Sequence, residues 1–276
     1  NVATAAGGGL HLEGANVTIE NVRIERNTAF WGGGLSVHNA HGSPGVTLRN
    51  TRLVANQAYE SGGALYLCAS SSTRLENVLI LDNVSPLGGG FTLEDSTSLI
   101  AVNSVIAANV ANNNGGAGQL LQGSTFGGTN TLIWGNLAQQ GGGLYGSNAQ
   151  ADLSHCDVHA NDPNDFHGLD DPTGTDGNIS VDPGFLDTSS PDPADWDLHL
   201  ALDSPPIDAG VGEILDRDGS SSDIGTFGGP AGATWDLDDD GYPSWWFPGP
   251  YDSDFYPPAW RACDALDASF HPAQGC

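Results

Sequence analysis

The chain has 276 residues, of which 34 are acidic and seven are basic, and its formal net charge is −27. Such a surface repels nucleic acid and anionic lipid, so we exclude both as partners. The sequence contains no apolar run long enough to cross a bilayer, so it predicts no membrane insertion.

A short glycine-rich signature recurs six times in the first part of the chain. Successive copies begin 25, 30, 26, 27 and 26 residues apart. A regular period in this range indicates a repeat architecture in which successive coils stack on one another. The copies are GGGLHL from Gly7, GGGLSV from Gly32, GGALYL from Gly62, GGGFTL from Gly88, GGAGQL from Gly115 and GGGLYG from Gly141.

Each repeat also carries two polar positions six residues apart with an apolar residue midway between them. The spacing stays constant while the flanking loops vary in length, which indicates a structural segment. The first column is Asn21, Asn50, Asn77, Asn103, Asn130 and His155; the second is Asn27, Asn56, Asn83, Asn109, Asn136 and Asn161; the apolar residues are Ile24, Leu53, Ile80, Ile106, Ile133 and Val158.

The segments 17–24, 46–53 and 75–81 are rich in β-branched residues and alternate apolar with polar positions, as strands do. Coils stacked directly on one another would pair these strands in parallel, about 4.8 Å apart. Both asparagine columns could then form side-chain ladders, and the glycine pairs would fit tight corners or close backbone contacts. A helical solenoid is the alternative, but a glycine pair and two asparagines per repeat would weaken helices. We therefore predict an all-β protein, a right-handed single-stranded parallel β-helix.

The glycine signature followed by N-x-x-[IL]-x-x-N resembles the repeats of polymorphic outer-membrane proteins and other pectin-lyase-like β-helices of bacterial surfaces. The resemblance covers residues 7 to about 161. It implies the fold and a secreted or cell-surface location, but this superfamily includes lyases, hydrolases, adhesins and passive scaffolds.

The sequence contains no methionine and opens inside a coil, with six residues before the first glycine signature. A terminal coil normally needs a cap. We therefore expect a processed or excised fragment whose upstream part, including any signal peptide, is missing.

The negative charge is concentrated in the second half of the chain. Residues 1–150 contain eight acids and five arginines, a net charge of −3, whereas residues 151–276 contain 26 acids and two arginines, a net charge of −24. Cations are therefore the natural partners of the second half.

The four cysteines suggest one disulfide bond. Cys263 and Cys276 flank a short acidic segment and would close a small loop, as in secreted chains. Cys68 and Cys156 lie three coils apart, roughly 14 Å along the axis, which is too far to bridge. We expect each of these two to be a buried small hydrophobe.

The period ends after residue 161, and residues 161–195 are rich in Asp, Pro and Gly, which indicates a loop. Short strands are expected around 196–202 and 224–227. The succession DPGF, D-x-x-L, SPPIDAG, D-x-D-G and DIG resembles the closing segment of secreted bacterial β-helix proteins that end in a sorting or anchoring tail. We interpret residues 162–229 as a closing coil and C-terminal cap, so that the β-helix domain spans 1–229 and a separate tail spans 230–276.

The tail carries the clearest metal-binding pattern. DLDDDGY places Asp236, Asp238 and Asp240 at positions one, three and five of a calcium loop, with glycine at six and the Tyr242 carbonyl at seven. The glutamate expected at position twelve is replaced by Phe247. Further ligands would have to come from elsewhere, first from Asp264 and Asp267 and then from Asp252 and Asp254.

The tail resembles the Asp-rich, Cys-containing metal-binding repeats of bacterial secreted proteins, in the style of dockerin and thrombospondin type 3 calcium loops. An inserted aromatic stretch, PSWWFPGPYDSDFYPPAW, departs from those repeats. We predict calcium as the cofactor, with a solvated acidic turn as the alternative. The aromatic residues could stack on sugars, but a domain of this size needs aromatics simply to fold, and we favour packing.

Two further clusters leave alternatives open. Asp216, Asp218 and Asp223 form either a second calcium site or a β-turn held by side-chain hydrogen bonds. His155, Cys156, Asp157, His159 and His167 could hold a transition metal, but His155 lies in the first polar column, which favours a structural role.

Catalysis is not expected. β-helix lyases abstract a proton with Lys or Arg and act on polyanions, whereas this chain has no lysine and an acidic surface. Hydrolases need two carboxylates about 5 to 10 Å apart, and the acids of the coils are scattered. We predict a bacterial, secreted or cell-surface, non-catalytic, calcium-stabilised β-helix with a structural or adhesive role. The alternatives are a carbohydrate-binding or polysaccharide-degrading protein, and a subunit that associates with itself or with other subunits of an extracellular assembly.

Overall fold

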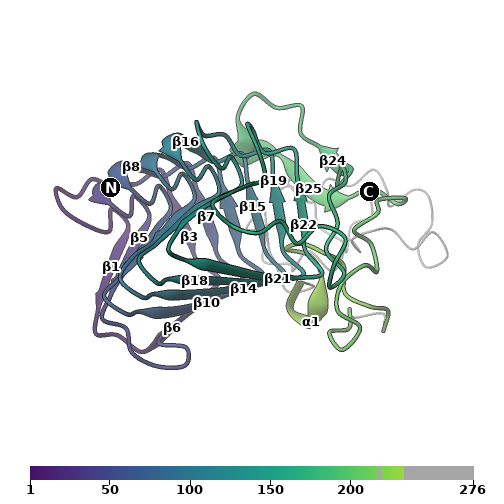
Figure 1. Ribbon diagram of the computed structural model, residues 1–276, viewed down its shortest axis with the longest axis horizontal. Helices are drawn as coiled ribbons and strands as arrows, with labels where there is room; N and C mark the ends of the chain where they lie inside the picture. Colours follow the sequence, from purple (N-terminus) through teal and green to yellow (C-terminus); the bar gives the residue numbers. More distant parts are fainter. Residues whose placement is uncertain (217–218, 233–276) are drawn as a thin grey trace, which may run out of the picture.

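The computed structural model describes residues 1–216 and 219–232. Its main body is a parallel β-solenoid in which coils follow one another from the N-terminus toward β21 (Gln150–Ser154) and β22 (Asp157–His159) (Figure 1). Four parallel sheets run along the sides of the stack. The predicted all-β parallel architecture is therefore confirmed.

A coil contributes at most one strand to each sheet, so neighbouring strands in a sheet are one coil apart in sequence. Sheet I contains β1 (Leu10–Glu13), β5 (Leu35–His38), β9 (Leu65–Cys68), β13 (Phe91–Leu93), β17 (Gly118–Leu121), β20 (Leu144–Ser147) and β23 (Phe166–His167). Sheet II contains β2 (Val17–Glu20), β6 (Val46–Arg49), β10 (Ser72–Glu76), β14 (Ser98–Val102), β18 (Thr125–Thr129) and β21. Sheet III contains β3 (Arg23–Glu25), β7 (Arg52–Val54), β11 (Leu79–Leu81), β15 (Val105–Ala107), β19 (Leu132–Trp134) and β22. Sheet IV contains β4 (Thr28–Trp31), β8 (Gln57–Ser61), β12 (Val84–Leu87) and β16 (Val110–Asn114).

The segments expected as single strands each contain a corner. In the first of them, β2 ends at Glu20, Asn21 has a φ of 56°, and β3 begins at Arg23. The other members of the first polar column have φ between 44° and 52°. Asparagine adopts this left-handed conformation more easily than most residues. The column therefore marks the turn between sheets II and III, which strand alternation did not reveal.

The glycine pairs serve both purposes that the sequence predicts. The first glycine of each signature has a positive φ, for example 69° at Gly62. The second glycine lies against the next coil, and a Cβ on Gly63 would stand 2.1 Å from the carbonyl oxygen of Gly89. Coils can therefore approach closely at this corner only because the side chains are absent.

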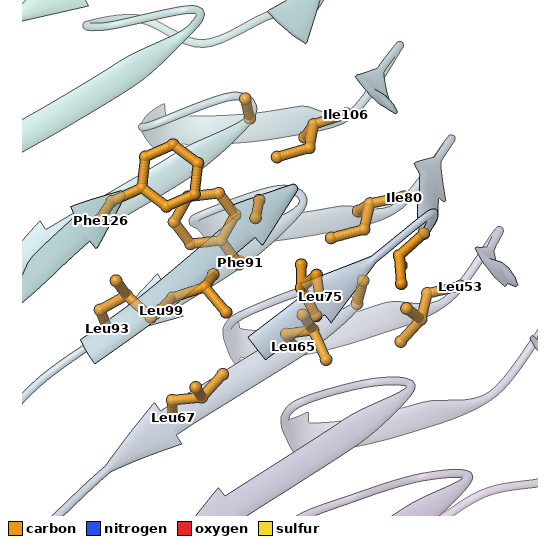
Figure 2. Close-up of a cluster of buried hydrophobic side chains, with 14 of the residues drawn as sticks. Leu53, Leu65, Leu67, Leu75, Ile80, Phe91, Leu93, Leu99, Ile106 and Phe126 are labelled. Carbon is orange, nitrogen blue, oxygen red and sulfur yellow. The ribbon is translucent and has the colours of Figure 1, made fainter. Parts of the chain in front are cut away.

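Inward-facing aliphatic and aromatic side chains fill the interior of the solenoid (Figure 2). The midway column pairs in register from Ile24 through Leu53, Ile80, Ile106 and Ile133 to Val158. On the facing side, Phe91 and Phe126 have ring centroids 5.1 Å apart. Each layer thus repeats the apolar contacts of the one before it.

The segment after residue 161 only partly follows the expectation of a closing coil and cap. Residues 162–181 do form a shorter coil, because Asp162 pairs with Leu137, β23 pairs with β20, and Ile179 pairs with Asp157. Residues 182–216 and 219–229, here named the strap, turn back along the side of the stack instead of capping its end. The strap carries an antiparallel pair of strands, β24 (Phe185–Asp187) and β25 (Asp197–Leu200), a short 3-10 helix, η1 (Pro193–Asp195), and the start of α1 (Gly229–Gly232). Residues 224–227, expected as a strand, form turns.

A second apolar core lies between the strap and the outer face of sheet III. Its buried members are Val54, Leu79, Leu81, Val105, Ala107, Leu132, Leu198 and Ile224. The strap reaches back to the first coils, where Asp192 lies 3.3 Å from Arg26 and the Ala194 carbonyl accepts a hydrogen bond from Arg52 at 3.2 Å. This covering explains why the outward residues of β11, β15 and β19 are apolar.

Cys68 and Cys156 are free and buried, as expected. Burial raises the pKa of the Cys68 thiol to about 11 and that of Cys156 to about 12, so both remain protonated at neutral pH. Among the described residues, no helix has the length and apolarity needed to cross a membrane.

Candidate functional site

Sheets I and IV meet at the first coils in a group of rings, here named the aromatic cluster. It comprises the buried Tyr66 and four rings that are at least partly exposed, His11, Phe30, Trp31 and His38. Side chains alternate between the two faces of a strand. Leu10, Leu35 and Leu65 point into the core, so the next residue on each strand points outward. Stacked coils therefore bring outward side chains from distant repeats together.

The rings of the cluster contact one another in sequence. Phe30 and Trp31 have centroids 4.6 Å apart, and Trp31 stacks on Tyr66 at 6.4 Å. His38 lies 5.8 Å from Tyr66 and 5.0 Å from His11. Phe30 and Trp31 are each 38% exposed, so parts of both rings remain open to a ligand.

Two carboxylates flank the rings. Tyr66 Oη donates a hydrogen bond to Glu94 at 2.9 Å. Glu13 lies 4.0 Å from His11 Nε2 and 3.9 Å from His38 Nδ1. Burial and the hydrogen bond to Glu94 raise the pKa of Tyr66, while burial and the neighbouring His11 lower the pKa of His38 despite the opposing effect of Glu13. The cluster thus offers a phenol, neutral imidazole and carboxylate oxygens beside open aromatic faces.

This combination contains the kinds of group that contact sugars. Aromatic faces stack on the apolar faces of sugar rings, and carboxylate oxygens accept hydrogen bonds from hydroxyl groups. Glu13 pairs with His38, His38 with Cys68, and Glu94 lies level with Cys68 in the following coil. The backbones of the two acids are therefore three coils apart, about 14 Å along the axis.

The second asparagine column forms an uninterrupted amide ladder. From Asn27 to Asn136, the backbone N–H and side-chain Nδ2 of each member both donate to Oδ1 of the next member, at 2.8–3.0 Å. Nδ2 also donates to the carbonyl of an apolar midway residue, as Asn83 does to Leu53 at 2.9 Å. At the far end, Asn161 donates to Asp165 Oδ1, at 2.7 Å from Nδ2. These amides are buried structural groups.

The first column does not form the second ladder that we expected. The side chains of Asn77 and Asn103 donate to the strap, at Thr226 and Gly228 and at Ser222 and Asp223. Asn130 accepts from the backbone N–H of Val211 at 2.8 Å. The left-handed corner directs these three amides outward, toward the strap, rather than along the stack. The other two asparagines of the column, Asn21 and Asn50, lie at the corresponding corners of the first two coils, each with positive φ.

Of the possible second calcium site, the structure describes Asp216 and Asp223, whereas Asp218 lies outside the described residues. Asp216 Oδ2 accepts the backbone N–H of Asp223 at 3.0 Å, and Asp223 Oδ1 accepts that of Asp208 at 2.9 Å. Asp216 Oδ1 also accepts the backbone N–H of Gly229. Both oxygens of Asp216 and one oxygen of Asp223 therefore accept backbone hydrogen bonds within the strap.

The main calcium prediction lies wholly outside the described residues. It comprises Asp236, Asp238, Asp240, Tyr242, Asp264 and Asp267, together with the reserve ligands Asp252 and Asp254 and the disulfide pair Cys263 and Cys276. Within residues 1–216 and 219–232, no group of three or more His, Cys, Asp or Glu side chains is arranged to hold a metal ion.

The residues around His155 lie apart on the last regular coil. His155 Nδ1 is 2.9 Å from Ser154 Oγ, His159 Nδ1 is 3.4 Å from Ser180 Oγ, and His167 stacks on Tyr145 at 5.3 Å. Asp157 is fully buried beneath residues 179–181, and its Oδ1 accepts the backbone N–H of Val181 at 3.1 Å. Each of these side chains has its own structural neighbours.

The sequence interpretation missed the aromatic cluster. The signal was present in the glycine signatures, whose fifth position holds His11, Ser36, Tyr66, Thr92, Gln119 and Tyr145. This column is outward-facing once the fourth position is assigned to the core. Trp31 and Phe30 come from another part of the repeat, and only the coil geometry brings them beside it.

Comparison with known proteins identifies one family. The family model described as "Right handed beta helix region" matches residues 1–162. No curated protein and no solved structure matches the chain.

Proposed function

Because the chain belongs to the right-handed β-helix family, we propose that it is a non-catalytic adhesive scaffold that presents a glycan-binding surface on a rigid rod. The observation that carries this proposal is the aromatic cluster. Its exposed Trp31 and Phe30 rings stand beside Glu13 and Glu94 on a stack held by the amide ladder and the close glycine contacts.

Rigidity favours binding. A preorganised surface loses little conformational entropy when a ligand binds, so more of the contact energy appears as affinity. The rings come from different coils whose spacing is set by parallel strand pairing. A flexible polymer can then be held by several weak contacts at fixed distances.

The proposed location is the bacterial cell surface or the extracellular space, and calcium is proposed as the stabilising ion of the acidic tail. The resemblance of the repeats and the concentration of acids in residues 151–276 support this proposal. Association with further copies or with other subunits of an extracellular assembly is compatible with the same role.

A glycan array with the labelled full chain tests the proposal. We expect binding to a defined subset of glycans and a loss of about tenfold in affinity for Trp31→Ala, because one stacked ring contributes on the order of 1 kcal/mol. Tyr145→Ala is the matched control, since Tyr145 also lies on the outer face of sheet I but far from the cluster.

Two outcomes would contradict the proposal. Equal losses of glycan affinity for Trp31→Ala and Tyr145→Ala would show that the aromatic cluster does not bind the glycan. Release of reducing ends from a bound polysaccharide, abolished by Glu13→Gln or Glu94→Gln, would instead establish the polysaccharide-degrading alternative.

A further inference from the structure

The outer face of sheet IV presents outward residues from five successive coils. The ladder shifts register at these positions, because Trp31 pairs with Ser61 and Leu87 pairs with Asn114. Ala29 pairs with Ala58, and Ser85 pairs with Ala111, all four being inward-facing. The residues that follow them point outward, and Leu137 and Gln140 extend the same sheet into the next coil through pairs with Val110 and Asn114. The resulting row, here named the strip, is Phe30, Tyr59, Pro86, Asn112 and Gln139.

The strip is uncharged, in contrast to most of the molecule. Across β4, β8, β12 and β16, Glu60 is the single ionisable acid or base, apart from the phenol of Tyr59. The neighbouring outward row, Thr28, Gln57, Val84, Val110 and Leu137, is also uncharged. A ligand on this row would therefore desolvate no charged side chain other than Glu60.

Composition changes along the strip. The first two coils contribute aromatic rings, with Tyr59 59% exposed, and Pro86 follows. The last two coils contribute exposed amides at Asn112, Asn113 and Gln139. Aromatic faces offer stacking, whereas amides offer one acceptor and two donors to hydroxyl groups.

The coil spacing of about 4.8 Å is close to the length of one pyranose unit in a linear polymer. A chain of sugars lying along the solenoid axis would therefore meet one strip residue per sugar. Trp31, at the end of β4, joins the strip to the aromatic cluster.

We propose that the strip binds an uncharged, linear glycan that lies along the solenoid axis, stacked on the aromatic coils and hydrogen-bonded by the amide coils. This inference rests on the proposed glycan-binding function and specifies its ligand class and orientation. Acidic glycans are disfavoured by the chain's net charge and by the nearby Glu60, and the strip has no arginine to pair with them.

Titration calorimetry with oligomers of two to six sugars tests the orientation. The probes are β-1,4-linked glucose and N-acetylglucosamine oligomers, with oligogalacturonate as the acidic arm. We expect affinity for one of the uncharged series to rise until about five sugars, when the strip is filled, and no binding of oligogalacturonate.

Variants at the two ends provide the discriminating measurement. Tyr59→Ala should lower the affinity for oligomers of every length about tenfold. Gln139→Ala should lower the affinity several-fold, and only for oligomers of about five sugars or more. Gln150→Ala is the matched control, an exposed glutamine on sheet II, and should change nothing.

The other outcomes each overturn the inference. Binding that depends on Trp31 but stops improving after two sugars would place the glycan across the rod and leave the adhesive function standing. If no oligomer binds and the glycan array is also negative, the proposed glycan-binding function is wrong as well. Sedimentation showing a dimer that Tyr59→Ala dissociates would assign the strip to a second copy of the chain.

Discussion

The fold raises the pKa of the Asp157 carboxyl group above its ordinary value. It is fully buried, and its Oδ2 has no hydrogen-bond partner. Burial, together with the charges of Asp165 and Asp182, outweighs the Val181 hydrogen bond and raises the pKa of Asp157 from 3.8 to about 7. The folded state therefore holds this proton at pH values where the unfolded chain has lost it.

The pH dependence follows from this difference. A raised folded-state pKa contributes stability that is fully present below pH 4 and lost as the pH rises through 7. Asp157→Asn keeps the acceptor for Val181 and cannot ionise. We expect the variant to match the parent near pH 4 and to exceed it at pH 8 by up to about 4 kcal/mol in free energy of unfolding.

Urea unfolding at several pH values measures this effect. Asp152→Asn is the control, because it removes the same charge from an exposed position on the same coil. An identical pH profile for the two variants would show that general charge repulsion, not burial of Asp157, sets the dependence.

Residue identities alone predicted the second asparagine column but not the partners of the first. Asn56, Asn83 and Asn109 bond to equivalent residues one coil away, so periodicity reveals both donor and acceptor. Asn77 and Asn103 bond to residues more than 100 positions later in the chain. No repeat links those partners, which are set by where the strap docks.

At the scale of the element, the glycine corner sets how closely two coils approach. Gly63 has backbone on every side: a Cβ there would meet Gly89 O at 2.1 Å and Val84 N at 2.8 Å. Gly127, on β18, is different, because the nearest atom to its Cβ position is Ile100 Cγ1 at 3.8 Å. Both glycines lie within the stack, so they form a matched pair.

We expect Gly63→Ala to lower the free energy of unfolding by about 3 kcal/mol or more, because neither backbone segment can move without parting the coils. Gly127→Ala should change it by less than about 1 kcal/mol. Denaturant unfolding followed by tryptophan fluorescence compares them, and insolubility of Gly63→Ala alone agrees with the expectation. Equal midpoints for the two soluble variants would contradict it.

The strap was the element that the sequence did not predict correctly. β25 falls within the strand expected around 196–202, whereas β24 lies among prolines and aspartates that indicate a loop. The informative signal lay elsewhere, in β11, where Leu79, Ile80 and Leu81 are apolar in succession and so break the alternation of a half-exposed strand. Three apolar residues in a row indicate that both faces of sheet III are covered.

At the scale of the whole molecule, the excess of acid leads us to expect that cations stabilise the fold. We predict that removing calcium with a chelator lowers the melting temperature by several degrees, because an ion that binds only the folded state stabilises it. Scanning calorimetry of the full chain with calcium and with chelator measures the shift. Asp238→Asn should abolish it, whereas Asp170→Asn, an exposed acid of the closing coil, should preserve it.

A melting curve that is unchanged after complete calcium removal would exclude this stabilising role. A shift that persists in Asp238→Asn would move the ion to other residues. The sequence predicted the solenoid well because six copies of one pattern reinforce each other. The tail pattern occurs once, so nothing in the chain corroborates its ligands.

The amide ladder has a direction. Every rung donates to the asparagine of the later coil, and the last rung donates to the Oδ1 of Asp165, which is not part of the column. The ladder therefore ends at Asp165, whereas its internal rungs all make the same hydrogen bonds, whatever their number. Copying one internal coil of 26 or 27 residues would leave both termini untouched. Lengthening by tandem duplication within the stack is thus the simplest route by which such a protein could extend its reach.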